Sequence, residues 1–357
     1  MRWDTQLVDR EEAGERLPLG NTEALVRRFN TPEFRGITFY EIFAKSIINH
    51  VPGDRFGFNW TINPYRGCSH ACKFCFARPT HTYLDLNAGT DFDTKIVVKV
   101  NAVELLAREL RKKSWAGESI AMGTNTDPYQ RAEGHYKITR GILKELNAVR
   151  NPYSILTKGT LIQRDIDLLQ EGASVTDVHA NFSVGTVDED VWKKTEPGTP
   201  HPMKRLEVVS KLNDAGIPCG VLMAPILPGI SDAPEQLEAT VKAIAESGAT
   251  HISPIVLHLR PGVKEEFLPW LESAYPNLIR PYEEMYKRTN APKETRERIG
   301  KMVANNRRKY GGGLYEKTVE KSKEPREDSQ TQLSLDLDLG ARRAPKWVKE
   351  NLNTGAS

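Results

Sequence analysis

The chain alternates strand-like and helix-like segments over most of its length, and this order restricts the fold more than any other feature. The sequence predicts strands at residues 58–63, 119–123, 153–157, 178–184, 219–226 and 252–259. It predicts helices at residues 100–112, 138–149, 161–170, 204–214, 234–246 and 265–274, one after each strand. Because parallel strands must be joined by long crossovers, the chain is predicted to be an α/β protein with a parallel sheet.

The loop after the first predicted strand carries three of the four cysteines in the run Gly67-Cys68-Ser69-His70-Ala71-Cys72-Lys73-Phe74-Cys75-Phe76. Thiolates this close in sequence can point into one small volume, as a soft metal centre requires. Three ligands do not fill a four-iron cube, so one iron would stay open. The alternative is a structural zinc site with a distant fourth ligand such as His70 or His81.

The cysteine spacing, with an aromatic residue just before Cys75, resembles the signature of the radical S-adenosylmethionine (SAM) superfamily. The resemblance implies a 4Fe–4S cluster on Cys68, Cys72 and Cys75, with SAM chelated to the open iron. One electron from a donor such as flavodoxin or ferredoxin would then cleave SAM to methionine and a 5′-deoxyadenosyl radical. The family fold is a partial (β/α)6 TIM-like barrel, and reactive groups in such folds gather at the carboxyl ends of the strands.

Polar residues follow the second, third and fourth predicted strands. Gly123, Thr124 and Asn125 end the second, where the resemblance implies a site for the amino group of SAM, and the alternative is a polar turn that caps a helix. Lys158 ends the third and is suited to the SAM carboxylate, although a lone loop lysine is usually only solvated. Ser183 faces the barrel interior and is predicted to bind the ribose hydroxyls.

Later residues extend this predicted site. Glu196 and Arg205 flank a Pro/Gly loop, and we expect them to hold that loop over the site, to place Arg205 at the SAM carboxylate, or to form a surface salt bridge. Tyr129, His258 and Arg260 are the predicted substrate-side residues.

Four motifs together resemble a narrower branch, the spore photoproduct lyase-related "DNA repair photolyase" proteins, in an actinobacterial form. They are Asn63-Pro64-Tyr65-Arg66-Gly67-Cys68, Thr126-Asp127-Pro128-Tyr129-Gln130, Glu196-Pro197 and Pro225-Ile226-Leu227-Pro228-Gly229. The resemblance implies repair or modification of nucleic acid, with DNA as a partner. One departure from the branch argues against thymine-dimer reversal as the reaction of this chain. The branch enzyme returns a hydrogen atom from a cysteine near the end of strand two, and this chain has no cysteine there. The spare Cys219 begins strand five.

The chain is predicted to divide into an N-terminal extension packing on the barrel (1–55), the core barrel (56–290), a C-terminal helical cap (291–315) and a flexible, disordered tail (316–357). The tail segment Gln332–Leu337 resembles the peptide by which repair proteins dock on the replication sliding clamp. No signal peptide or membrane span is evident, which predicts a cytoplasmic protein. The net charge of +3 permits a nucleic-acid partner without requiring one.

Two other functions remain open from the sequence. One is radical SAM modification of a protein or a small metabolite. The other is a non-catalytic, clamp-associated metal-binding protein.

Overall fold

The computed structural model describes residues 16–19, 22–52 and 58–313. The segment Gln332–Leu337, predicted above to dock on the sliding clamp, and the rest of the predicted tail lie outside these residues.

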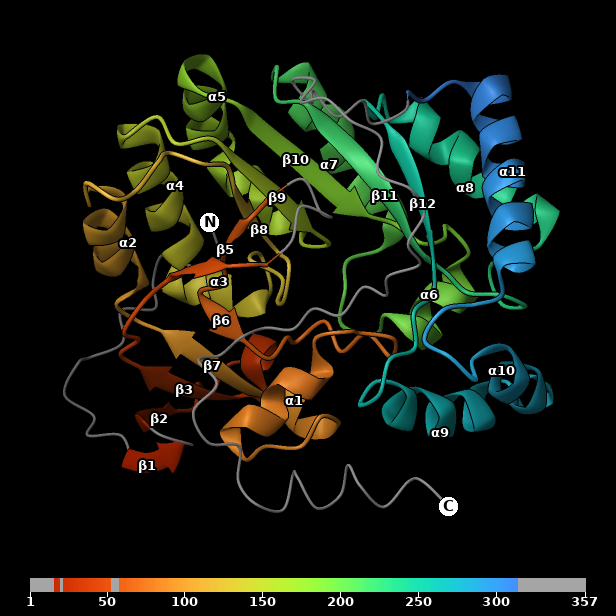
Figure 1. Cartoon of the computed structure of the whole chain (residues 1–357), viewed down its shortest axis with the longest axis horizontal. Helices are drawn as coiled ribbons and strands as arrows, with labels where there is room; N and C mark the ends of the chain where they lie inside the picture. The colour runs from red at the N-terminus through yellow and green to blue at the C-terminus, as the bar shows by residue number, and fades with distance from the viewer. Residues whose placement is uncertain (1–15, 20–21, 53–57, 314–357) are drawn as a thin grey trace.

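A seven-stranded sheet dominates the fold, in the order β12-β11-β10-β9-β8-β5-β4 (Figure 1). Its strands are β4 (Ile48–His50), β5 (Trp60–Ile62), β8 (Ile120–Met122), β9 (Tyr153–Thr157), β10 (Val178–Ser183), β11 (Cys219–Ile226) and β12 (Ile252–Val256). All neighbours from β5 to β12 are parallel, and β4 adds to β5 in the antiparallel sense. The predicted parallel α/β sheet of six strands is therefore confirmed.

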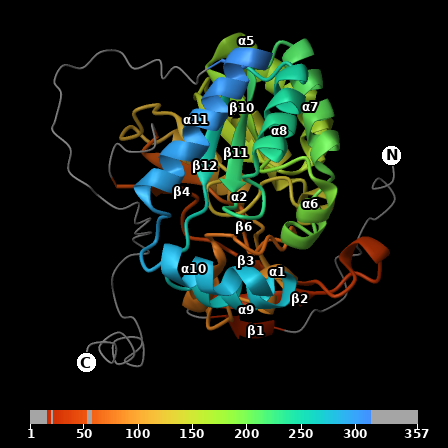
Figure 2. The ribbon, with the colours of Figure 1, turned by 90° about the vertical axis from the view of Figure 1, so that its right-hand side faces the viewer.

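Helices connect these strands and cover one face of the sheet, with α7 and α8 on that side (Figure 2). The helices are α1 (Thr90–Thr94), α2 (Ala102–Leu110), α3 (Arg131–Tyr136), α4 (Ile138–Ala148), α5 (Ile166–Val175), α6 (Glu189–Thr195), α7 (Pro202–Asp214), α8 (Pro234–Glu246), α9 (Lys264–Ala274), α10 (Ile279–Met285) and α11 (Lys293–Tyr310). No helix of the described residues combines the length and the apolar character that a bilayer crossing demands.

Alternate residues of each strand face the helices and form the core, as the period of two in a strand requires. Ile155, Phe182 and Val221 are completely buried on that side. The opposite face is only partly covered, and it carries Asn181, whose buried side-chain oxygen has no protein partner. Polar groups on this face that lack a hydrogen-bond partner in the protein are therefore available to bind a ligand or water.

A second sheet of five strands lies below the carboxyl ends of the large sheet in Figure 1, in the order β1-β2-β3-β7-β6. Its strands are β1 (Arg16–Leu19), β2 (Thr22–Arg27), β3 (Thr38–Ile42), β6 (Tyr65–Arg66) and β7 (Lys95–Lys99). β7 is not among the strands predicted above, although its run of Ile96, Val97 and Val98 is typical of a strand. It pairs with β3 and β6, which come from segments earlier in the chain.

The free edge of β12 is blocked by distant residues. The amide of Ile252 donates to Gly313 O (3.2 Å), and Arg307 donates to Ile252 O (2.9 Å). Pro254, two residues further on, has no N–H to offer. The edge therefore cannot readily extend the sheet by pairing with another strand.

Candidate functional site

The cysteine loop lies between the two sheets, immediately after β6. Gly67 precedes it with a φ of +76°, and a Cβ there would approach Phe92 O to 2.9 Å, so only glycine fits without displacement. The Cys68 amide donates to the same Phe92 oxygen (2.9 Å). Cys68 and Cys72 are buried and Cys75 is partly buried.

The motif at residues 126–130, which follows β8, holds the cysteine loop from one side. Thr126 donates to Tyr65 O (3.0 Å), and Gln130, completely buried, donates to Gly67 O and accepts from the Ser69 amide (3.0 and 3.1 Å). Asp127 pairs with His70 at 3.3 Å. The motif therefore positions the cysteine loop.

Asp127 also joins this loop to the end of β9. It accepts from Thr157 Oγ1 (2.6 Å) and from the Lys158 amide (2.6 Å). Burial lowers the pKa of His70, but Cys68 and Asp127 raise it to about 10. Burial raises the pKa of Asp127, and His70 more than offsets this, so the pair is charged at neutral pH.

Arg78, which is not among the predicted site residues, holds the cysteine loop from the other side. Its guanidinium donates to Cys72 O (3.0 and 3.2 Å) and pairs with Asp93 at 2.8 Å. It is 3% exposed, so the Cys72 carbonyl is held by a buried charge.

The loop from Glu196 to Pro200 packs on the cysteine loop. The Gly198 amide donates to His70 O (3.0 Å), and a Cβ at Gly198 would meet Ser69 O at 2.2 Å. The Lys73 amide donates to Thr195 O (2.9 Å). Glycine at this position therefore permits direct backbone contact between the two loops.

A buried charged network joins this loop to the strand ends. Lys158 Nζ donates to Ser183 Oγ (2.7 Å) and pairs with Glu196 (2.6 Å), and it lies 5.5 Å from the centre of the Phe74 ring. Arg205 pairs with the other oxygen of Glu196 at 2.5 Å. Lys158 and Ser183, predicted separately, are therefore in direct contact beside the aromatic residue that precedes Cys75.

Arg205 is completely buried and uses its donors within the protein. Besides Glu196, it donates to Pro200 O (2.8 Å) and Ser183 O (2.9 Å). Burial raises the pKa of Glu196, but Arg205 and Lys158 outweigh burial and lower it to about 2. Of the roles expected for Arg205, this geometry favours holding the loop.

Gly123, Thr124 and Asn125 follow β8 at the same edge of the sheet. A Cβ at Gly123 would lie 1.9 Å from Leu156 O, so no other residue fits there unless β9 moves. Asn63 accepts from the Asn125 amide (3.2 Å) and lies 3.5 Å from Thr124 Oγ1. The side-chain oxygen of Asn125 is buried with no protein partner, an acceptor that suits an ammonium group.

The three predicted substrate-side residues do not lie together. Arg260 donates to Phe76 O beside the last cysteine. His258 instead bonds to Asn290 and lines a cavity of about 230 Å³ between β12 and α11. Tyr129 is buried in the core and bonds to Asp165 (3.2 Å), a position that does not favour the predicted substrate-side role. Cys219 is completely buried and is the first residue of β11. It is therefore at the opposite end of this strand from the carboxyl end, where the candidate site lies.

The donor set of three cysteine thiols is one that an iron–sulfur cluster uses. Cys75 packs against the small cluster of Cys68, Ala77 and Phe92, so these two thiols are neighbours. Among the residues that the structure describes, no three His, Cys, Asp or Glu side chains converge on one point as ligands of one ion. Burial raises the pKa of Cys75 to about 11, so binding iron must release protons.

Comparisons with known proteins agree with this geometry. The Radical SAM superfamily model matches residues 62–251. An uncharacterized protein of Mycobacterium tuberculosis is 46% identical over 282 residues, covering 78% of this chain and 83% of the relative. An uncharacterized protein of Methanocaldococcus jannaschii is 31% identical over 198 residues, covering 55% of this chain and 70% of the relative.

Among solved structures, spore photoproduct lyase complexed with dinucleoside spore photoproduct matches with a TM-score of 0.58 and 15% identity, covering 76% of this chain and 79% of that one. A mutant of the same lyase with bound AdoMet matches with a TM-score of 0.55 and 17% identity, over 73% and 76% of the two chains. These likenesses establish a shared fold. This chain belongs to the radical SAM superfamily of enzymes.

Proposed function

We propose that this chain binds a 4Fe–4S cluster through Cys68, Cys72 and Cys75, binds SAM at the adjoining strand ends, and acts on nucleic acid in repair or modification. When bound, the cluster and SAM supply one-electron cleavage of SAM to a hydrogen-abstracting radical. The observation that carries the proposal is the position of the cysteine loop, fixed by Asp127 and Gln130 against the carboxyl ends of the parallel strands.

The residues of the strand ends have separate tasks in this proposal. Asn125 offers its free acceptor to the SAM ammonium group, and Gly123 lets the backbone approach. Lys158 and Ser183 offer polar groups to the carboxylate and the ribose, and Glu196 with Arg205 keeps them in place. A flavodoxin or ferredoxin would supply the electron.

Nucleic acid is the proposed substrate because the fold is shared with an enzyme solved with a dinucleoside photoproduct. Modification of a protein or a small metabolite is the second candidate. The reaction differs from that of a lyase with a donor cysteine at strand two, since Thr124, Asn125 and Thr126 occupy that region here.

Anaerobic reconstitution with iron and sulfide tests the cluster. The wild-type protein should become brown, bind about four irons per chain and form 5′-deoxyadenosine from SAM with dithionite. Cys72→Ala should lose both properties, and Cys219→Ala, which alters the buried fourth cysteine, should keep both. Zinc without iron in the reconstituted wild type would contradict the proposal.

The substrate is tested by deuterium transfer from labelled oligonucleotides, damaged and undamaged, into 5′-deoxyadenosine. Transfer supports nucleic acid as the substrate. Transfer only from peptides or metabolites would support the second candidate.

A further inference from the structure

Three cations near the cysteine loop form no ion pair with any carboxylate in the part of the chain that the structure describes. Within the described residues, Arg66, Lys99 and Arg260, here called the rim cations, take part in no ion pair, whereas buried Arg78 and Arg205 each have one. Glu109 acts on Lys99 electrostatically, but its oxygens accept from the Ile47 and Ile48 amides.

The rim cations are also substantially removed from water. Lys99 is 8% exposed, and Arg66 and Arg260 are partly buried. Burial lowers the pKa of Lys99 to about 7. The Nε atom of Arg260 is buried without a partner. Burying unpaired cations opposes folding, so they are suited to an anion that arrives after folding.

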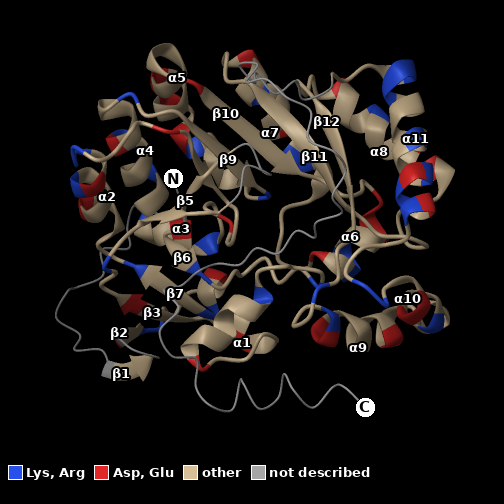
Figure 3. Cartoon of the chain, in the orientation of Figure 1, with Lys and Arg blue, Asp and Glu red and all other residues tan. Residues whose placement is uncertain are grey.

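The register of the small sheet places two of them together. Arg66 lies opposite Val97 across the β6–β7 pair, and Lys99 is two residues further along β7. Directly opposed residues share a face, and so do residues two apart, so Arg66 and Lys99 are on the same side of the sheet. Figure 3 shows lysine and arginine on β6, on β7 and on the loop before α9.

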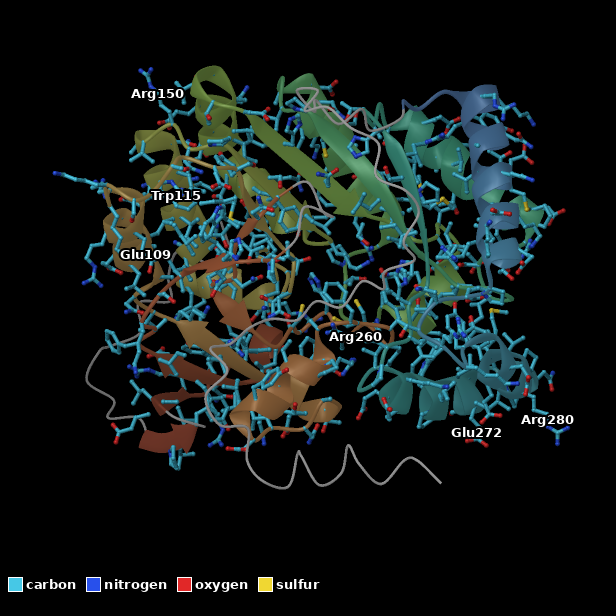
Figure 4. The ribbon with its side chains drawn as sticks, viewed as in Figure 1. Glu109, Trp115, Arg150, Arg260, Glu272 and Arg280 are labelled. Carbon is cyan, nitrogen blue, oxygen red and sulfur yellow. The ribbon has the colours of Figure 1, made fainter. Side chains whose placement is uncertain are left out.

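Tyr83 precedes Leu84, which packs against the buried cluster that contains Ile42 and Val97, next to Lys99 and Arg66 in the small sheet. Arg260 reaches the cysteine loop, where it donates to Phe76 O and lies 5.9 Å from the centre of the Phe76 ring. Figure 4 shows Arg260 on the loops between the large sheet and α9. The cysteine loop is therefore flanked by Arg66, two residues before Cys68, and by Arg260 at its other end.

Three exposed aromatic rings come from segments next to the rim cations. Phe76 is 39% exposed and Tyr83 is 61% exposed. Phe43, 77% exposed, follows Ile42, whose partner across the β3–β7 pair is Lys99. Large exposed rings near cations are the combination that binds a flexible strand, with phosphates on the cations and bases stacked on the rings.

Other anions fit this arrangement less well. The carboxylate of one SAM molecule needs one cation, and three rim cations exceed that need. A stiff duplex is contacted mainly by protruding side chains, whereas partly buried cations require a backbone that can bend towards them.

We propose that Arg66, Lys99 and Arg260 bind successive phosphates of a single-stranded or locally opened nucleic acid, with Tyr83 and Phe76 stacking its bases, and so lead the strand to the cysteine loop. This inference rests on the proposed action on nucleic acid. It adds the path that the strand takes over the protein and the single-stranded form in which it binds.

Fluorescence anisotropy of the reconstituted full chain with a labelled single-stranded oligonucleotide, as DNA and as RNA, tests the proposal. The variant Arg66→Gln/Lys99→Gln/Arg260→Gln should bind at least about tenfold more weakly. The dependence of log affinity on log salt should fall by about two, because each single-strand phosphate contact contributes about 0.7. The matched control is Arg111→Gln/Lys193→Gln/Lys287→Gln, which removes the same charge from exposed positions and should bind like wild type.

Tyr83→Ala should weaken binding several-fold and Tyr83→Phe should restore it, because stacking needs the ring and not the hydroxyl. Circular dichroism of each variant confirms folding. The proposal would be overturned if the rim and control variants lost affinity equally, or if duplex bound more tightly than single strand. Either result would still be compatible with nucleic acid as the substrate. Absence of binding by wild type to any oligonucleotide would overturn both. A preference for DNA or for RNA identifies the source of the strand.

Discussion

Two groups of buried charge surround the cysteine loop, and they differ in whether the protein itself supplies their partners. The supporting residues Arg78, Asp127, Glu196 and Arg205 each have an ion pair and further hydrogen bonds. The rim cations have no ion pair among the described residues. The paired group fixes the shape of the site, and the unpaired group leaves positive charge available for a ligand.

This difference has an energetic consequence. Removing one member of a buried pair leaves the other charge without compensation, and this is strongly destabilising. Removing an unpaired buried cation instead relieves a desolvation cost. Substitutions in the two groups should therefore change stability in opposite directions.

The largest effect is expected for Arg205→Met, which leaves Glu196 buried with Lys158 as its remaining cation. The free energy of unfolding should fall by about 3–5 kcal/mol, measured by urea denaturation. The control Lys204→Met removes the neighbouring exposed cation and should change it by less than about 0.5 kcal/mol. Equal effects of the two substitutions would show that the buried pair is unimportant.

Because the pKa of Glu196 is lowered in the folded protein, we expect the free energy of unfolding to depend on pH. Its pKa is about 2 in the folded protein against an ordinary value of 4.5, so the unfolded state binds its proton first as pH falls. The contribution of Glu196 is complete above 4.5 and disappears as pH falls towards 2. The stability difference between wild type and Glu196→Gln should shrink by about 2 kcal/mol between about pH 6 and about pH 3. A constant difference would contradict the assignment.

A smaller effect is expected for Asp127→Asn, which removes the ion pair with His70 but keeps a side-chain acceptor. Stability should fall by about 1–2 kcal/mol, and the reconstituted protein should lose iron to a chelator several-fold faster. Asp177→Asn, at an exposed pair with His179, is the control. Unchanged iron loss would show that Asp127 does not support the cysteine loop.

The smallest effect, and the one of opposite sign, is expected at β7. Lys99→Met should leave stability unchanged or raise it by up to about 1 kcal/mol, because an unpaired buried charge is replaced by an apolar side chain. Lys95→Met at the other end of the strand breaks a pair with Asp91 and should lower stability by a few tenths of a kcal/mol. Marked destabilisation by Lys99→Met would mean that Lys99 has a partner in the folded protein.

The sequence alone determined the parallel sheet and the three-thiol loop. Apolar residues repeat with strand and helix periods in local segments, and the spacing of Cys68, Cys72 and Cys75 is local as well. Local patterns could also place Lys158 and Ser183 at strand ends. They could not show that these two side chains bond to each other and to Glu196, since the contacts cross 25 and 38 residues.

The contacts of the polar residues depend on the three-dimensional fold and could not be predicted from local patterns. Tyr129 and Gln130 are adjacent in one motif, but Tyr129 turns into the core and Gln130 turns to the cysteine loop. The small sheet likewise depends on β7 pairing with β3 and β6, which no local pattern specifies. The physical reason is that burial and pairing of a polar group depend on neighbours distant in sequence, whereas strand and helix periods depend on residues close by.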